Sequence, residues 1–110
     1  MHLTIRATNL SVTDAIREHV SRRVLGAAQR FARRLSSVTV VIEDVNGPKG
    51  GVDIACRIEG GMAQSGEPVV ITERADDLYG AVDRAASRFK RAMVRRADRR
   101  KARARSARRH

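Results

Sequence analysis

The sequence contains very few aromatic residues. Of its 110 residues, two are Phe, one is Tyr and none is Trp. Proteins that bind single-stranded nucleic acid without sequence preference stack successive bases on aromatic side chains. Because Phe31 and Phe89 occupy apolar faces that we expect in the core, only Tyr79 is left for such stacking. The scarcity therefore disfavours base stacking as a binding mechanism.

Cysteine is equally scarce. Cys56 is the only one, so an intramolecular disulfide is impossible and a structural zinc site with four ligands is disfavoured. Cys56 alternates with the inward-facing residues of a predicted strand, which predicts a buried, inert thiol. This cysteine usage indicates a reducing compartment.

Long hydrophobic runs are absent as well. A membrane-spanning helix needs about 18 or more consecutive apolar residues, and the sequence has no such run. The first ten residues, MHLTIRATNL, lack the basic and then apolar segments of a signal peptide. A basic helix can lie on a membrane surface, but the apolar face of the helix considered below is needed for the core. We therefore expect a soluble, cytoplasmic protein that does not bind membranes.

Motifs for catalysis or metal binding are also missing. The three histidines, His2, His19 and His110, are scattered and match no metal or catalytic motif. His19 lies at the flank of an apolar helix face, which predicts a partly buried, hydrogen-bonded packing residue. The glycine-rich segments 46–51 and 59–68 do not open a helix, as a phosphate-binding loop would. We predict no enzyme, no cofactor and no small-molecule substrate.

Acidic residues are scarce in the last quarter of the chain, where basic residues are abundant. From Arg84 to His110 the only acidic residue is Asp98, and the whole chain has a formal net charge of +11. So large an excess of one sign predicts a polyanionic partner. The length allows one domain with one small core.

The segment from Ala75 to Lys101 has the clearest helical pattern. One narrow face is apolar and is expected in the core; it comprises Leu78, Val82, Ala85, Phe89 and Met93. Four arginines, which we call the arginine stripe, follow i, i+4, i+7 and i+11 spacing over an arc of about 60° away from that face. They are Arg84, Arg88, Arg91 and Arg95.

The arginine stripe is the candidate binding surface. Surface helices are usually charged, so a merely solvated face is the alternative interpretation. A solvated face normally mixes signs, however, whereas like charges at this spacing repel one another by a few tenths of a kcal/mol per pair. We therefore expect an external anion to neutralise the stripe. Contacts with phosphates and with the shape of folded RNA are the favoured mode.

The rest of the chain predicts further elements. Thr13 is a good N-cap for the first helix, Gly26 within it suggests close packing or a bend, and Asp76 is the expected cap of the last helix. Gly60 and Gly61 predict a turn. The expected elements are a strand at 2–7, a helix from Thr13 to about Leu35, a strand at 38–45, a loop at 46–51, a strand at 52–59, and a strand within 62–74 that is clearest at 69–72.

The order β-α-β-β-β-α predicts an α+β fold with a four-stranded mixed sheet and two helices packed on one face. A strand-helix-strand unit favours parallel pairing, and the two short connections favour antiparallel pairing. The other face is left to solvent or a partner, and its expected residues are Thr4, Arg6, Thr39, Arg57 and Thr72. The apolar pattern stops after Met93, so we expect a domain at 1–96. Over residues 97–110 we expect a projecting helical end that frays into a basic, disordered tail, which can order on a polyanion.

Two motifs resemble a known family. DLYGAVD, Asp77–Asp83, resembles the D-(M/L)-Y-x-A-(I/V)-D signature of the ribosome hibernation promoting factors and the ribosome-associated inhibitor, also called the sigma-54 modulation family. VTDAIREHV, Val12–Val20, resembles the start of the first helix in that family. The resemblance covers about residues 1–96. It implies a fold akin to a double-stranded RNA-binding domain.

The resemblance also implies a function. Such proteins bind the small ribosomal subunit over the mRNA channel and the tRNA A and P sites, and they inhibit translation in idle cells. Their second helix contacts ribosomal RNA through basic residues that match Arg88, Arg91 and Arg95, and Arg84 extends this row. Arg23 matches a basic position of the first helix. Relatives often have lysines where this chain has Gly26 and Gln29, so Arg22 and Arg30 are candidate replacements.

The sequence leaves some alternatives open. We expect a short form, because the sequence contains no counterpart of the extra C-terminal domain of the long forms. Short forms either promote ribosome dimers or stabilise single inactive ribosomes, and the tail does not decide between them. A protein-interaction module that regulates transcription and a general nucleic-acid-binding protein are the other functional interpretations.

Overall fold

The computed structural model describes residues 1–46 and 50–108 and confirms the predicted fold class. In chain order the elements are β1 (His2–Thr8), α1 (Asp14–Ala28), the short 3-10 helix η1 (Gln29–Phe31), β2 (Leu35–Asp44), β3 (Ile54–Met62), β4 (Val69–Ala75) and α2 (Leu78–Arg108). The strands form one sheet in the order β1-β2-β3-β4, with β1 parallel to β2 and the other pairs antiparallel. The tip of the predicted loop, residues 47–49, lies outside the described residues.

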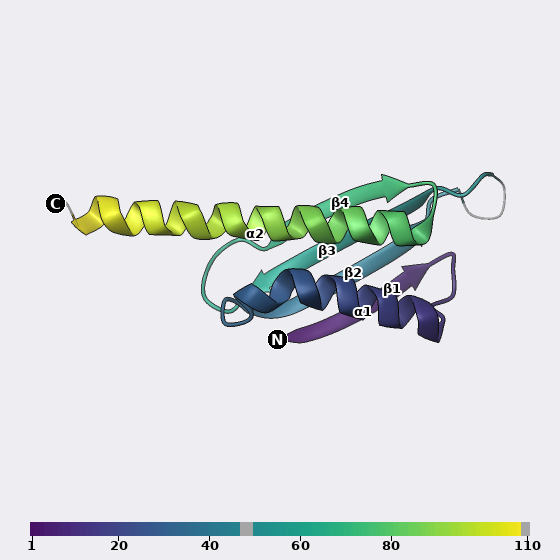
Figure 1. Cartoon of the computed structure of the whole chain (residues 1–110), viewed down its shortest axis with the longest axis horizontal. Coiled ribbons are helices and arrows are strands. Elements are labelled where there is room, and N and C mark those ends of the chain that lie inside the picture. Colours follow the sequence, from purple (N-terminus) through teal and green to yellow (C-terminus); the bar gives the residue numbers. More distant parts are fainter. Residues whose placement is uncertain (47–49, 109–110) are drawn as a thin grey trace.

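Both helices lie side by side on one face of the sheet (Figure 1). The opposite face carries the residues that we expected there, of which Thr4, Arg6, Arg57 and Thr72 are exposed and Thr39 is half-buried. At the start of α1, the Thr13 hydroxyl accepts a hydrogen bond from the backbone N–H of Ile16 at 3.2 Å. This bond satisfies one of the free donors of the first turn and confirms the predicted N-cap.

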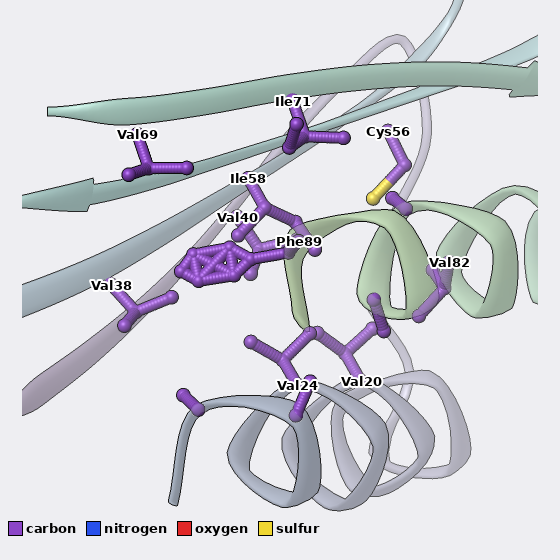
Figure 2. Close-up of a cluster of buried hydrophobic side chains, with 14 of the residues drawn as sticks. Val20, Val24, Val38, Val40, Cys56, Ile58, Val69, Ile71, Val82 and Phe89 are labelled. Atoms are coloured by element: carbon purple, nitrogen blue, oxygen red, sulfur yellow. The ribbon is translucent and has the colours of Figure 1, made fainter. Parts of the chain in front are cut away.

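The core lies between this helix pair and the sheet. Figure 2 shows Val20 and Val24 of α1 and Phe89 of α2 pointing toward side chains of the sheet, while Val82 of α2 points toward α1. Phe89 is fully buried and its ring packs among residues of the three strands β2, β3 and β4. Burial of a large apolar side chain stabilises a fold by about 1.5–3 kcal/mol, so α2 contributes strongly to the stability of the domain.

The first helix ends earlier than the apolar pattern predicts. α1 stops at Ala28, and after η1 the strand β2 begins at Leu35 instead of Val38. The reason lies in distant residues: Leu35 pairs with Met62 of β3, and the Arg34 carbonyl accepts a hydrogen bond from the Ala63 N–H at 2.8 Å. Pairing with β3 thus overrides the local helical pattern.

The predicted turn at Gly60 and Gly61 is wrong, because both glycines lie within β3. A Cβ atom built on Gly60 would lie 2.8 Å from Cζ of Phe89 and 3.0 Å from Cδ2 of Leu35. The absence of a side chain at position 60 therefore lets the aromatic ring pack directly against the backbone of β3.

Gly26 has a different environment from the one expected. It is exposed within α1, and a Cβ atom built on it would meet no atom within 4 Å, so the expectation of close packing is wrong. Because Ala is a better helix former, Gly26→Ala should raise the free energy of unfolding by about 0.5–1 kcal/mol. Urea denaturation measures this change, and a lower stability of the variant would contradict the prediction.

The second helix begins one residue later than expected and is much longer. Asp77, not Asp76, caps α2, since its carboxylate accepts a hydrogen bond from the Gly80 N–H. Residues 97–108 continue α2 beyond the sheet (Figure 1), which confirms the projecting helical end that we expected, although the helix reaches further before any fraying than predicted. This segment consists mainly of Arg and Ala, which are strong helix formers, and has no Gly or Pro to end the helix. The last two residues of the predicted tail, 109–110, lie outside the described residues. A domain boundary near residue 96 stays a prediction.

Cys56 is fully buried on the core face of β3, as predicted. Burial disfavours the thiolate and raises the pKa of the thiol to about 12, from an ordinary value of 9.0. At pH 8 the thiolate population is then about 1000-fold smaller than for an unperturbed thiol, and alkylation of the native protein should be slower by at least about that factor. Mass spectrometry after iodoacetamide treatment, with urea-unfolded protein as the control, measures the rate. Equal rates in both states would overturn the prediction.

Candidate nucleic-acid interface

All four side chains of the arginine stripe are exposed on the outer surface of α2. The apolar face of the same helix, with Val82, Ala85, Phe89 and Met93 buried, turns toward the sheet and α1. The two faces diverge because α2 keeps regular helical geometry from Leu78 onward, so spacing in the sequence becomes position around the helix. The stripe does not turn inward.

Two arginines of the stripe have partners within the protein. Nη1 of Arg84 donates to the carbonyl oxygen of Arg74 at 3.4 Å, and Nη1 of Arg88 donates to that of Thr72 at 3.2 Å. Arg88 also forms an ion pair with Glu73, with 3.4 Å between Nη1 and Oε1. The expectation that an external anion neutralises the stripe is therefore wrong at Arg88, because Glu73 of the protein itself supplies a counter-charge there.

These partners follow from the position of β4 at the edge of the sheet. An edge strand presents backbone groups that no neighbouring strand satisfies. α2 packs beside β4, so long side chains one helical turn apart reach two carbonyls of that strand. Arg84 and Arg88 thus help to cover the edge of the sheet. The ion pair between Arg88 and Glu73 is exposed, and a pair of this kind stabilises a fold by at most about 1 kcal/mol.

Arg91 and Arg95 continue the stripe toward the C-terminal end of α2. Both side chains are exposed, and neither forms a hydrogen bond or ion pair with any other residue in 1–46 or 50–108. They are one helical turn apart and therefore project from the same side of α2. In these two guanidinium groups all the N–H donors are therefore available to bind an external anion.

Arg23 of α1 is held by Asp83 of α2. Nε of Arg23 donates to Oδ1 of Asp83 at 2.9 Å, and Nε2 of His19 lies 2.9 Å from the same oxygen. The His19 ring meets the Tyr79 ring edge to face, with 4.6 Å between centroids. This network confirms the predicted packing role of His19 and joins the two helices. It engages only Nε of Arg23, so the two Nη groups can still donate to a partner.

Arg22 and Arg30 lie in different surroundings. Nη1 of Arg22 is 3.9 Å from Oε1 of Glu18 one turn earlier in α1, a long and exposed ion pair. The guanidinium of Arg30, in η1, lies 5.6 Å from the centre of the Phe31 ring. Arg30 does not line the groove that Arg22 and Arg23 share with α2. The structure thus brings Arg22 and Arg23 together and leaves Arg30 apart.

A shallow basic groove of about 460 Å³ separates the outer sides of α1 and α2. It is lined by Arg22, Arg23, Gly26, Ala27, Ala86, Ser87 and Lys90. Gly26, Ala27 and Ala86 have small side chains or none, which leaves space between the helices. The three cations that line the groove are Arg22, Arg23 and Lys90. Sequence reasoning missed Lys90, although its position between the apolar face and the arginine stripe, on the side where Asp83 lies, could have indicated it.

The described residues offer neither a metal site nor a membrane-spanning helix. Residues 1–46 and 50–108 contain no cluster of three or more His, Cys, Asp or Glu side chains that could hold a metal ion. The described helices include none that is long and apolar enough to cross a membrane. The site therefore consists of guanidinium and ammonium donors, which bind phosphate and carboxylate groups.

Comparison with known proteins gives concordant matches. Residues 3–101 match the profile of the family described as "Sigma 54 modulation protein / S30EA ribosomal protein". The ribosome hibernation promoting factor of Azotobacter vinelandii is 28% identical over 94 residues, which cover 86% of this chain and 80% of that protein.

Solved structures are similar over most of the chain. The N-terminal domain of Protein Y from Thermus thermophilus is 25% identical with a TM-score of 0.66, covering 86% of this chain and 98% of that one. A ribosomal subunit interface protein from Coxiella burnetii is 14% identical with a TM-score of 0.74, covering 89% of this chain and 99% of that one. The second likeness concerns the fold alone.

Proposed function

The chain belongs to the sigma 54 modulation protein / S30EA ribosomal protein family, and on this premise we propose that it is a ribosome hibernation factor. It binds the small ribosomal subunit in the cytoplasm, at the mRNA channel and the tRNA A and P sites, and inhibits translation in idle cells. The named relative from Azotobacter vinelandii supports this function.

The observation that carries the proposal is the presence of Arg91 and Arg95 as exposed cations that pair with no other described residue. They lie on the outer side of α2, and the basic groove with Arg22, Arg23 and Lys90 lies on the side of α2 that faces α1. Phosphates of ribosomal RNA supply the counter-charges that no described residue provides at these positions. Occupation of the decoding region then excludes mRNA and tRNA sterically, with no chemical step.

Cosedimentation with purified small ribosomal subunits tests the proposal. The protein should pellet with the subunits in the absence of any other protein, and the logarithm of its affinity should fall linearly with the logarithm of salt concentration. In vitro translation of a reporter mRNA should fall as the protein is added. Failure to cosediment would contradict the proposal and favour a protein-interaction module.

The same experiment separates the general nucleic-acid-binding alternative. Duplex DNA added as a competitor at equal phosphate concentration should displace little protein from the subunits, whereas a general binder would be displaced. Sucrose-gradient profiles of whole ribosomes, recorded with the translation assay, show whether bound ribosomes dimerise or stay single.

A further inference from the structure

A second basic cleft lies where α2 leaves the sheet, away from the groove between the helices. It has a volume of about 810 Å³ and is bounded by the turn after η1, the β3–β4 loop and the extended part of α2. We call it the arginine cleft, and its six arginines are Arg33, Arg34, Arg96, Arg99, Arg100 and Arg103. None of them belongs to the arginine stripe.

The sequence pattern explains why the cleft is basic. The apolar face of α2 ends at Met93, and Arg96 and Arg100 continue that same face beyond the end of the core. Nη1 of Arg96 donates to the carbonyl oxygen of Glu67 at 3.0 Å, and Nη2 of Arg100 donates to Oε1 of Gln64 at 3.4 Å. The helix thus turns these arginines toward the β3–β4 loop, and Arg33 and Arg34 line the cleft beside them.

The charges of the cleft are unbalanced. Glu67 is the only acidic residue in its lining, and none of the six arginines forms an ion pair within residues 1–46 and 50–108. Like charges gathered around one concavity repel one another, and bound anions remove this repulsion. Arginine presents a planar fork of donors that fits phosphate oxygens.

The extent of the cleft indicates which anion it fits. Arg96, Arg100 and Arg103 lie on successive turns of α2, and the distance from Arg96 to Arg103 along the helix axis is about 10 Å. One phosphate group cannot contact donors spread over that length, whereas a run of linked phosphates can. The lining of the cleft reaches Arg103 of α2, and this part of the helix projects beyond the sheet (Figure 1), so a chain can enter and leave the cleft along the helix.

We infer that the arginine cleft binds consecutive phosphates of a single RNA strand. This inference deepens the proposed function and rests on it for the choice of RNA as the source of the phosphates. It assigns the protein a second RNA contact, separate from that of the arginine stripe. The contact is made to the backbone and is independent of base sequence.

A triple substitution tests the inference. Arg33→Gln, Arg99→Gln and Arg103→Gln remove three charges from exposed side chains, and Gln preserves helix propensity. For a fluorescently labelled 12-nucleotide RNA, the slope of log affinity against log salt should fall by about 2, since each lost contact with a single strand removes about 0.7. At 0.1 M salt this corresponds to about 100-fold weaker binding.

A matched triple variant controls for net charge. Arg6→Gln, Arg17→Gln and Arg57→Gln remove the same charge from exposed positions outside the cleft, and binding of the RNA should weaken less than about threefold, because these side chains make no contact with the strand. Circular dichroism should show both variants folded, with the helix content of the parent protein. Equal losses in the two variants, or no loss in the first, would overturn the inference.

Two further measurements complete the test. The first identifies the ligand of the cleft, and the second tests the proposed function separately from this inference. Inorganic tripolyphosphate is used as a competitor, and tighter binding than the RNA at equal phosphate concentration would overturn the assignment to RNA. Small-subunit cosedimentation of the parent protein is measured in parallel. Its absence would count against ribosome binding, while the RNA affinities of the two triple variants still decide the assignment of the cleft.

Discussion

Replacing Arg91 and Arg95 by glutamine is expected to weaken binding to purified small ribosomal subunits about 40-fold at 0.1 M salt. Each phosphate contact contributes about 0.7–0.9 to the slope of log affinity against log salt, so loss of two contacts lowers the slope by about 1.6. The two side chains are exposed and pair with no other described residue. Stability should therefore stay within about 0.5 kcal/mol of the parent protein. Cosedimentation over a salt series measures the slope, and urea denaturation measures the stability.

The control for this experiment is Arg6→Gln with Arg57→Gln. These arginines are exposed on the face of the sheet opposite the helices, so the variant has the same net charge as the first. Its affinity for the small subunit should fall less than about threefold, because long-range attraction between exposed charges is screened within about 10 Å at 0.1 M salt. If both variants lose affinity equally, only net charge matters and the stripe is not a contact surface.

The stripe must be tested in two parts because its halves differ. Arg84 and Arg88 donate to carbonyls of the edge strand β4, so their substitution changes the cover of that edge as well as any RNA contact. Arg91 and Arg95 lie further along α2 and form no hydrogen bond or ion pair with any described residue. A fourfold substitution would mix both effects, whereas the pair at 91 and 95 isolates binding.

The fold class was predictable because its signals are local. Alternation over residues 2–7, helical spacing at Val20 and Val24, and the apolar face ending at Met93 each depend on neighbours within a few residues. The N-cap at Thr13 is likewise a property of one turn. Such patterns fix which face of each element is buried. The helix between β1 and β2 then returns the chain to the end of the sheet where β1 began, so that the two strands pair in parallel.

The sequence-based predictions were wrong where contacts between residues far apart in the sequence determine the local structure. Two adjacent glycines normally favour a turn, but Gly60 lies in β3 because the Phe89 ring occupies the space above it. The early start of β2 depends on pairing of Leu35 with Met62. The choice between two adjacent aspartates as the cap of α2 depends on the path of the chain after β4. None of these causes is visible in a short window of sequence.

The candidate site shows the same division. The stripe was predictable because one helix carries it. The partners of its first half were not, because they belong to β4, and neither was the engagement of Arg23 by Asp83, which lies 60 residues away in the sequence. Lys90 and the arginine cleft became visible only once α1, the β3–β4 loop and α2 were placed together.

The Phe89 ring should be the most costly side chain to remove. The ring is fully buried between α2, to which it belongs, and the sheet. Truncation of a buried Phe to Ala destabilises proteins by about 3–5 kcal/mol through lost burial and the cavity left behind. A small domain has about 5–15 kcal/mol in total, so Phe89→Ala should remove at least about a fifth of the stability. The urea midpoint measures the loss, and a change below about 1 kcal/mol would contradict the assigned role.

The contact between Phe89 and Gly60 predicts a coupling that distinguishes this packing from simple burial. A Cβ atom at position 60 would overlap the ring, so Gly60→Ala alone should cost about 1–3 kcal/mol through overpacking. In a Phe89→Leu background the smaller side chain leaves room for that atom, and the same substitution should cost less than about 1 kcal/mol. The difference is the interaction energy of a double-mutant cycle, and residues in contact typically give about 0.5–3 kcal/mol. Additive costs would mean that the ring does not press on the strand, whereas Gly26→Ala, which meets no neighbouring atom, should have the same effect in both backgrounds.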